Sequence, residues 1–254
     1  CTVTFDTVST VLYNDGTLIF NEPYSYRASN ITTHGAVATE YEPMSESNSY
    51  VFSSSSDVPW SSADVTITNI EVGSKMTPNS IDLWFSRFMS LKVVDLTNLD
   101  ISNITSLNDT FNQVGYMSES VSIDMTGWDT SNVTDMSHMF CMVAYESGIA
   151  ELKGLENWDT SSVTDMSSMF YGTIKSSDAP IVDLSNWNVS NVTNMSGMFG
   201  FGDVGMSGVW KFGNLSKWDT SKVTDMLGLF ENRGLGVSIG DLSNWNTSNV
   251  TNMY

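Results

Sequence analysis

The sequence is poor in basic residues, cysteine and histidine. Ten lysines and arginines stand against 29 aspartates and glutamates, which gives a net charge of −19. Such a surface repels phosphate groups, so we expect no electrostatic binding of nucleic acid or of anionic lipid. Two cysteines are too few for a disulfide framework. No apolar run approaches the roughly 18–20 residues that cross a bilayer, and we expect no membrane span.

Catalytic signatures are missing as well. His34 and His138 are the only histidines, and the sequence has no HExxH, GxSxG, P-loop or CxxC motif. Carboxylates are abundant, but a glycosidase pair needs two unequal environments, whereas most of these aspartates recur in identical contexts. The sequence therefore predicts no enzyme and no cofactor.

What the sequence does contain is a repeat. From residue 94 onward one unit recurs about every 29 residues, and we expect residues 94–254 to hold about six copies, the last one truncated. A period of this length, with one supersecondary unit per copy, predicts a solenoid. The anchor of each copy stands at Leu99, Trp128, Trp158, Trp187, Trp218 and Trp245.

Each unit has two parts. Upstream of the anchor, apolar residues at near-alternate positions, such as Leu184 before Trp187, predict a short strand. Downstream, Met136, Met139 and Phe140 have the spacing of one side of a short helix or 3₁₀ turn. The fold class predicted is thus an α/β repeat solenoid with one short strand and one short helix or 3₁₀ turn per unit.

A single unit is too small to bury its apolar residues, so the tryptophans, methionines and phenylalanines of successive units should stack on one another. The predicted repeat core consists of Leu99, Trp128, Met136, Phe140, Trp158, Met166, Phe170, Trp187, Met195, Phe199, Trp218, Met226, Phe230 and Trp245.

Two polar positions should form columns along the stack. Both change from aspartate to asparagine in the same repeats, which relieves repulsion between carboxylates one strand spacing apart. We interpret them as turn-forming and capping residues; the alternative is calcium held between adjacent carboxylates, although no DxDxDG-type loop is present. The columns are Asp129, Asp159, Asn188, Asp219 and Asn246, and Asp135, Asp165, Asn194, Asp225 and Asn252.

Residues 1–93 do not repeat. A hairpin is predicted around the Asn14-Asp15-Gly16 turn, a polar loop over 45–59, and a strand over 65–72. A helix should begin near Thr77-Pro78-Asn79, because the apolar residues from Ile81 to Met89 follow helical spacing. We expect the whole region to be a β-rich cap on the solenoid or a separate attachment domain.

The segment DTSNVTDMSHMF, from Asp129 to Phe140, carries a family resemblance. It resembles the repeat of the BspA-like leucine-rich-repeat proteins of bacterial surfaces, and the resemblance covers residues 94–254. It implies a leucine-rich-repeat-like solenoid that is displayed outside the cell and used for adhesion or recognition, without enzymatic activity. Similar repeats also look like those in some phage and large-virus proteins.

Two departures from the family pattern affect these expectations. The sequence shows no export signal and no wall-sorting motif, although Cys1 is the residue that lipobox cleavage leaves first. The last repeat reaches Tyr254 without a capping repeat, so either the array continues or a partner or second copy covers this end.

Two functional hypotheses follow. In the first, the chain is an extracellular recognition or adhesion module on a bacterial surface that binds a host protein or glycan through one face of the solenoid. In the second, it is a structural or receptor-binding component of a phage or virus particle. Recognition residues are expected where the repeats differ, in the loops 145–148, 175–178 and 202–205. They are also expected at the variable position occupied by His138, Ser168, Gly197 and Gly228.

Overall fold

The first elements that the structure describes form the antiparallel part of a single sheet. The structure is a computed structural model that describes residues 8–23, 27–41, 67–145, 149–173, 182–201, 212–231 and 240–254. Strand β1 (Val8–Tyr13) pairs antiparallel with β2 (Thr17–Pro23) and with β3 (Val37–Tyr41), and helix α1 (Arg27–His34) lies between β2 and β3 in the chain. The predicted hairpin is confirmed. Its turn uses Gly16, whose φ of 88° lies in a region that favours glycine.

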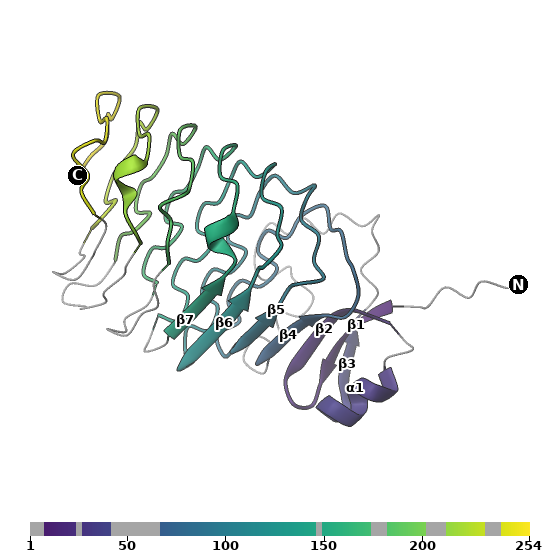
Figure 1. Cartoon of the computed structure of the whole chain (residues 1–254). Coiled ribbons are helices and arrows are strands. Elements are labelled where there is room, and N and C mark those ends of the chain that lie inside the picture. Colours follow the sequence, from purple (N-terminus) through teal and green to yellow (C-terminus); the bar gives the residue numbers. More distant parts are fainter. Residues whose placement is uncertain are drawn as a thin grey trace, which may run out of the picture.

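After the hairpin the chain forms a row of parallel coils that lie side by side (Figure 1). Strand β2 pairs parallel with β4 (Asn69–Val72), and β5 (Val93–Asp95), β6 (Ser120–Asp124) and β7 (Ile149–Lys153) add to it in order. The sheet order is therefore β3-β1-β2-β4-β5-β6-β7. We number the coils 1 to 7, for residues 69–91, 93–118, 120–145, 149–173, 182–201, 212–231 and 240–254.

The opposite side of each coil is just as regular. Single parallel bridges connect Ser106, Asp135, Asp165, Asn194, Asp225 and Asn252 in succession, one residue per coil. Next to this ladder runs an unbroken stack of phenylalanine rings, whose neighbouring centroids are 5.3–6.1 Å apart. The rings belong to Phe85, Phe111, Phe140, Phe170, Phe199 and Phe230.

The helix predicted to begin near residue 79 is wrong, because that segment is part of coil 1. Its backbone N–H groups donate sideways to coil 2: Phe85 to the Thr110 carbonyl at 3.2 Å and Arg87 to the Asn112 carbonyl at 2.7 Å. Arg87 also has a φ of 68°, which no right-handed helix accommodates. Regular stacking thus includes residues 69–91, which the sequence analysis placed in the N-terminal region.

Of the short helix or 3₁₀ turn predicted over Met136, Met139 and Phe140, the helix does not form, and the segment consists of turns closed by hydrogen bonds between residues three apart. Residues 137–145 are a series of tight turns, in which the N–H groups of residues 138–143 alternate between carbonyls of the next coil and carbonyls within the coil. Among the described residues of the coils, 3₁₀ helices occur instead just before the tryptophan, at Leu155–Asn157 and Leu215–Lys217. Apolar residues spaced three and four apart fit a series of turns as well as a helix, because both conformations place these side chains on one side of the segment.

The tryptophans stack like the phenylalanines. Trp128 lies 6.1 Å from Trp158 and Trp158 lies 6.2 Å from Trp187, with nearly parallel rings. The indole N–H of Trp187 donates to the Leu155 carbonyl of the preceding coil at 2.9 Å. Every residue of the predicted repeat core is buried except Phe230 and Trp245, which are partly buried and pack against it.

We expect Trp187→Ala to lower the free energy of unfolding by about 3–5 kcal/mol, because it removes a buried ring from the middle of the stack and leaves a cavity. Urea denaturation followed by circular dichroism measures this change. Trp245→Ala is the matched comparison and should cost clearly less, because that ring is only partly buried. Equal losses would contradict the stacked core.

Candidate functional site

One residue in each of coils 1 to 6 has a left-handed backbone at the same place, and we call this set the left-handed column. In coil 3 the Met139 N–H donates to the Met136 carbonyl, and His138 is the third residue of that turn. A positive φ at this position favours glycine, which Gly197 and Gly228 provide. The φ values are 64° at Leu83, 55° at Asp109, 57° at His138, 53° at Ser168, 62° at Gly197 and 61° at Gly228.

The structure brings the four predicted recognition residues into adjacent coils. The N–H of His138 donates to the Ser167 carbonyl at 2.9 Å, and the N–H of Ser168 donates to the Ser196 carbonyl at 2.8 Å. Gly197 and Gly228 continue the same ladder into coils 6 and 7. All four residues are partly exposed, so their variation has two causes, the backbone conformation and the accessible surface.

A groove of about 530 Å³ opens along this column at coils 4 to 7, and we call it the lateral groove. It forms where the side chains of the left-handed column become small, at Ser168 and the two glycines that follow it. Beside it, the position that is serine in coils 3 to 5 becomes Leu227, 42% exposed, and then Tyr254. The lining residues are Ser168, Ser196, Gly197, Leu227, Gly228, Glu231 and Tyr254.

The lateral groove has one formal charge among its described lining residues. Glu231 supplies it, and the Glu231 N–H donates to the Gly228 carbonyl at 2.9 Å, which holds the start of that side chain beside the column. Sequence reasoning found Ser168, Gly197 and Gly228 but missed Ser196, Leu227, Glu231 and Tyr254. The signal for Leu227 and Tyr254 was their departure from the serine of the repeat. His138 does not line the groove.

We call the column formed by Asp135, Asp165, Asn194, Asp225 and Asn252 the inner polar column. Its side chains stabilise turns within a coil and form hydrogen bonds between coils. Asp165 Oδ1 accepts the N–H of Ser167 at 2.8 Å, and Asn194 Oδ1 accepts the N–H of Ser196 at 3.0 Å. The Asn194 amide also donates to Asp165 Oδ2 at 3.0 Å, and Asn252 donates in the same way to Asp225 at 3.2 Å. The change from aspartate to asparagine therefore converts a repulsive contact into a charge-assisted hydrogen bond.

We call the column formed by Asp129, Asp159, Asn188, Asp219 and Asn246 the outer polar column. Its side chains are exposed and accept hydrogen bonds within their own coil. Asp129 Oδ1 accepts from the N–H and the hydroxyl of Ser131, and these hydrogen bonds lower the pKa of that carboxyl. Asn188 accepts from the N–H of Ser190 at 3.1 Å. Within the described ranges no group of three or more histidine, cysteine, aspartate or glutamate side chains could hold a metal ion. The carboxylates of the outer column accept hydrogen bonds within their own coil, and Asp165 and Asp225 of the inner column also accept them from the next coil.

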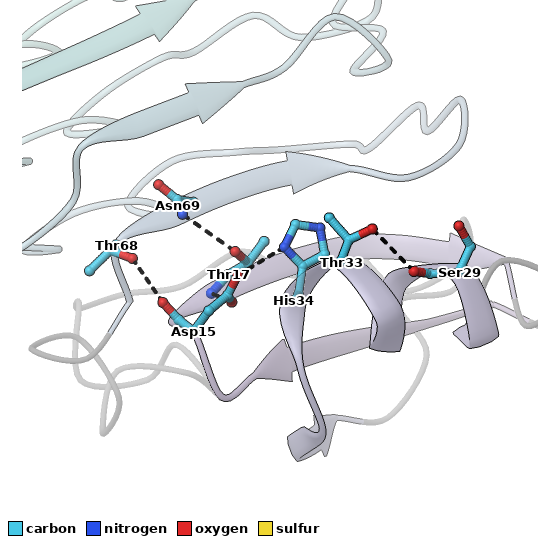
Figure 2. A network of polar contacts seen from close by, with 7 residues as sticks. All are labelled: Asp15, Thr17, Ser29, Thr33, His34, Thr68 and Asn69. Carbon is cyan, nitrogen blue, oxygen red and sulfur yellow. Dashed lines mark hydrogen bonds and ion pairs between the residues drawn. The ribbon is translucent and has the colours of Figure 1, made fainter.

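A separate polar network joins the N-terminal elements to coil 1 (Figure 2). His34 Nδ1, at the end of α1, lies 3.0 Å from Asp15 Oδ2 in the hairpin turn, and Asp15 Oδ1 accepts the N–H of Thr17. The Asn69 amide, on β4, contacts the Thr17 hydroxyl at 3.4 Å. These contacts fix α1 on the hairpin and the hairpin on coil 1, so the histidine has a structural role in this network.

Other residues from the sequence analysis are placed as follows. Cys141 is buried, and desolvation raises the pKa of its thiol to about 12, which keeps it protonated. The loop residues 146–148, 175–178 and 202–205, the polar loop 45–59 and Cys1 lie outside the described residues. Among the residues that the structure describes, no helix has the length and apolarity needed to cross a membrane.

The hydrogen bonds of the two polar columns predict that two matched substitutions lower the free energy of unfolding by unequal amounts. Asn194→Asp and Asn188→Asp each add one negative charge to coil 5, but only Asn194 donates to an aspartate of coil 4. We expect Asn194→Asp to cost about 1–2 kcal/mol more in the free energy of unfolding, because a hydrogen bond becomes a carboxylate pair. Urea denaturation at pH 7 and low salt tests this, and equal costs would be the contrary result.

Stability should decrease in acid. The hydrogen bond from Lys75 holds the pKa of Asp100 at about 2, and hydrogen bonds from serine residues lower the pKa of Asp129 and Asp183 below the usual 3.8. A carboxyl with a lower pKa in the folded chain stabilises the fold when ionised. Its contribution is complete above about pH 5 and is lost as the pH falls from about 4 toward 2.

An acid titration followed by circular dichroism measures this loss, and Asp100→Asn should make the decline less steep. Asp82 acts in the opposite direction, because burial raises its pKa and protonation therefore favours the folded chain. A free energy of unfolding that stays constant or rises between pH 4 and pH 2 would show that the lowered pKa values do not control acid stability.

Comparison with known families finds a match to two parts of the chain. Residues 79–145 and 204–254 match the model of a family described as Mycoplasma protein of unknown function, DUF285. The match begins inside coil 1, ahead of residue 94, and it is consistent with the resemblance carried by the repeats. No curated protein and no solved structure matches the chain.

Proposed function

We propose that the chain is a non-enzymatic recognition or adhesion module of a bacterial surface. In this proposal the row of coils is a leucine-rich-repeat-like solenoid of the BspA type, and its lateral face binds a protein or glycan ligand. The observation that carries the proposal is the lateral groove. There the otherwise uniform coils present side chains that differ from coil to coil, at positions that the repeat does not need for stacking.

The coils beneath the groove are held together by ring stacking and backbone hydrogen bonds, and the resulting rigidity supports a binding role. Phe170, Phe199 and Phe230 stack directly beneath the turns that carry the groove. The N–H groups of Gly197 and Gly228 donate hydrogen bonds to carbonyls of the next coil at 2.7 and 2.9 Å. Sites on rigid elements lose little conformational entropy on binding and hold their shape without a ligand.

Charge restricts the class of ligand. Among the described residues that line the groove only Glu231 is charged, and the whole chain carries a net charge of −19. Anionic ligands such as acidic or sulfated glycans would be repelled over the range of the Debye length. The Tyr254 ring, the Leu227 side chain and the serine hydroxyls suit a neutral or basic ligand with both apolar and hydroxyl surface.

The described side chains also favour binding over catalysis. The thiol of Cys141 is buried and held protonated, unlike a cysteine nucleophile. His34 is engaged with Asp15 in the N-terminal network. The aspartates of each column share one environment, whereas acid–base chemistry needs carboxyl groups whose pKa values differ. The alternative location, a phage or virus particle, assigns the same binding role to the groove.

A pair of matched variants tests the proposal. Gly228→Asn adds a side chain to the groove with a residue that tolerates a left-handed backbone, and the nearest described atoms to its new Cβ belong to the Glu231 side chain. His138→Asn places the same residue at the equivalent left-handed position of coil 3, outside the groove. We expect binding to an array of neutral oligosaccharides and immobilised extracellular-matrix proteins to fall at least tenfold for Gly228→Asn only.

Both variants should keep the melting temperature of the unaltered chain to within a few degrees, so that a loss of binding is not a loss of folding. If the unaltered chain bound none of these probes, or if both variants bound equally well, the groove would not be the recognition site.

A further inference from the structure

A second groove lies where coils 1, 2 and 3 join, and we call it the junction groove. It has a volume of about 560 Å³ and lies beside the starts of β5 and β6. Ser90 and Lys92 line it from the link between coils 1 and 2, and residues 117–120 line it from the link between coils 2 and 3. None of its described lining residues lines the lateral groove, so the two grooves are separate.

The backbone holds the two linking segments close together. The N–H of Met117 donates to the Met89 carbonyl of the preceding coil at 3.0 Å. Gly115, just before this contact, allows the close approach, because a Cβ there would lie 3.0 Å from the Val121 side chain and 3.1 Å from the Leu91 carbonyl oxygen. The shape of the junction groove is therefore fixed before any ligand binds.

The junction groove contains two opposite charges that the chain leaves without a partner. Lys92 and Glu119 both line it and both are exposed. Within the described ranges neither side chain forms an ion pair, with the other or with a third residue, whereas Lys153 pairs with Glu151 at 3.2 Å. A ligand that carries a negative and a positive group can pair with both side chains at once.

The charge of the whole chain favours a ligand of this kind. A net charge of −19 repels a purely anionic ligand. A purely cationic ligand is repelled by Lys92 and finds carboxylates over much of the remaining surface. A zwitterion has no net charge, so the chain does not repel it, and the junction groove offers a partner for each of its two charged groups.

The rest of the lining suits a ligand with amide groups between its charged ends. Ser118 is buried, and its hydroxyl donates to the Met89 carbonyl at the long distance of 3.5 Å, while Ser90 and Ser120 add two further hydroxyls. A hydroxyl can donate to a carbonyl and accept from an N–H. Met117 is 67% exposed, and its flexible apolar side chain can adapt to different ligand side chains.

From these observations we propose that the junction groove is a second binding site, for a short peptide with free termini. Lys92 pairs with the terminal carboxylate, Glu119 pairs with the α-ammonium group, and the serine hydroxyls bond the amides between them. The volume is that of a small-molecule site and holds a peptide of a few residues. This site is additional to the lateral groove and does not rest on the function proposed for it.

Isothermal titration calorimetry of the intact chain with the tripeptide Ala-Leu-Ala tests the proposal. We expect saturable binding of one peptide per chain at millimolar concentration or below. Lys92→Gln and Glu119→Gln should each weaken the binding by about threefold, because each removes one charge pair at a partly open site. Lys153→Gln is the matched control, since it removes the same charge outside the groove, and it should leave the affinity unchanged.

Peptides with blocked termini show which end each side chain binds. A C-terminal amide should weaken binding to the unaltered chain but not to Lys92→Gln, and an N-terminal acetyl group should do the same for Glu119→Gln, because each pair of changes removes one interaction. In NMR spectra the peptide should shift the backbone amide signals of residues 90–92 and 117–120 and leave those of Gly197 and Gly228 in place.

Three results would overturn the proposal: no saturable binding, equal binding of a peptide blocked at both ends, or signal shifts confined to residues outside the junction groove. All the substituted side chains are exposed, so the variants should keep the melting temperature of the unaltered chain. Gly228→Asn tests the lateral groove separately, so either proposal can fail alone.

Discussion

The structure depends on one constraint: a coil cannot satisfy its own backbone or bury its own rings. In coil 3 the N–H groups of Met136, His138 and Phe140 all donate to carbonyls of coil 4. The rings stack in the same direction, so hydrogen bonding and apolar burial are both interactions between coils. Stability is then a sum of nearest-neighbour terms, as in other repeat proteins. A coil without a neighbour on one side therefore exposes backbone groups and rings that a neighbouring coil would cover.

The same constraint explains how so acidic a chain can stack identical units. Parallel stacking repeats each side chain about every 4.8 Å, which would place like charges in columns. Hydrogen bonds from Ser167 and Ser131 use the carboxylate oxygens locally, and asparagine at 194 and 252 bridges to the aspartate before it. The polar columns thus contribute to the fold, and their regularity is a poor indicator of a metal or catalytic site.

Much of this organisation could be predicted from the sequence, because repetition shows which residues share an environment. The hairpin around Asp15 and the buried tryptophans followed from local patterns. The helices did not, since Met136, Met139 and Phe140 have spacing that fits both a helix and a run of turns. Hydrogen bonds to a neighbouring coil decided between them, and such bonds leave no local signal. The groove depended on single departures from the repeat, Leu227 and Tyr254, which pattern averaging discards.

Variation at one position of a repeat can reflect either the backbone conformation or the accessible surface. The backbone requirement has to be accounted for before the variation is assigned to function. The turn requires a left-handed backbone at His138, Gly197 and Gly228 alike, and glycine adopts it without strain, so glycine at this position has a structural reason. Leu227 has no such reason, because its backbone plays the same part as that of Ser196 and only its exposed side chain differs. The residues that carry most information about recognition are therefore those that depart from the repeat at positions where the backbone conformation requires no particular residue. In this chain they lie along one groove.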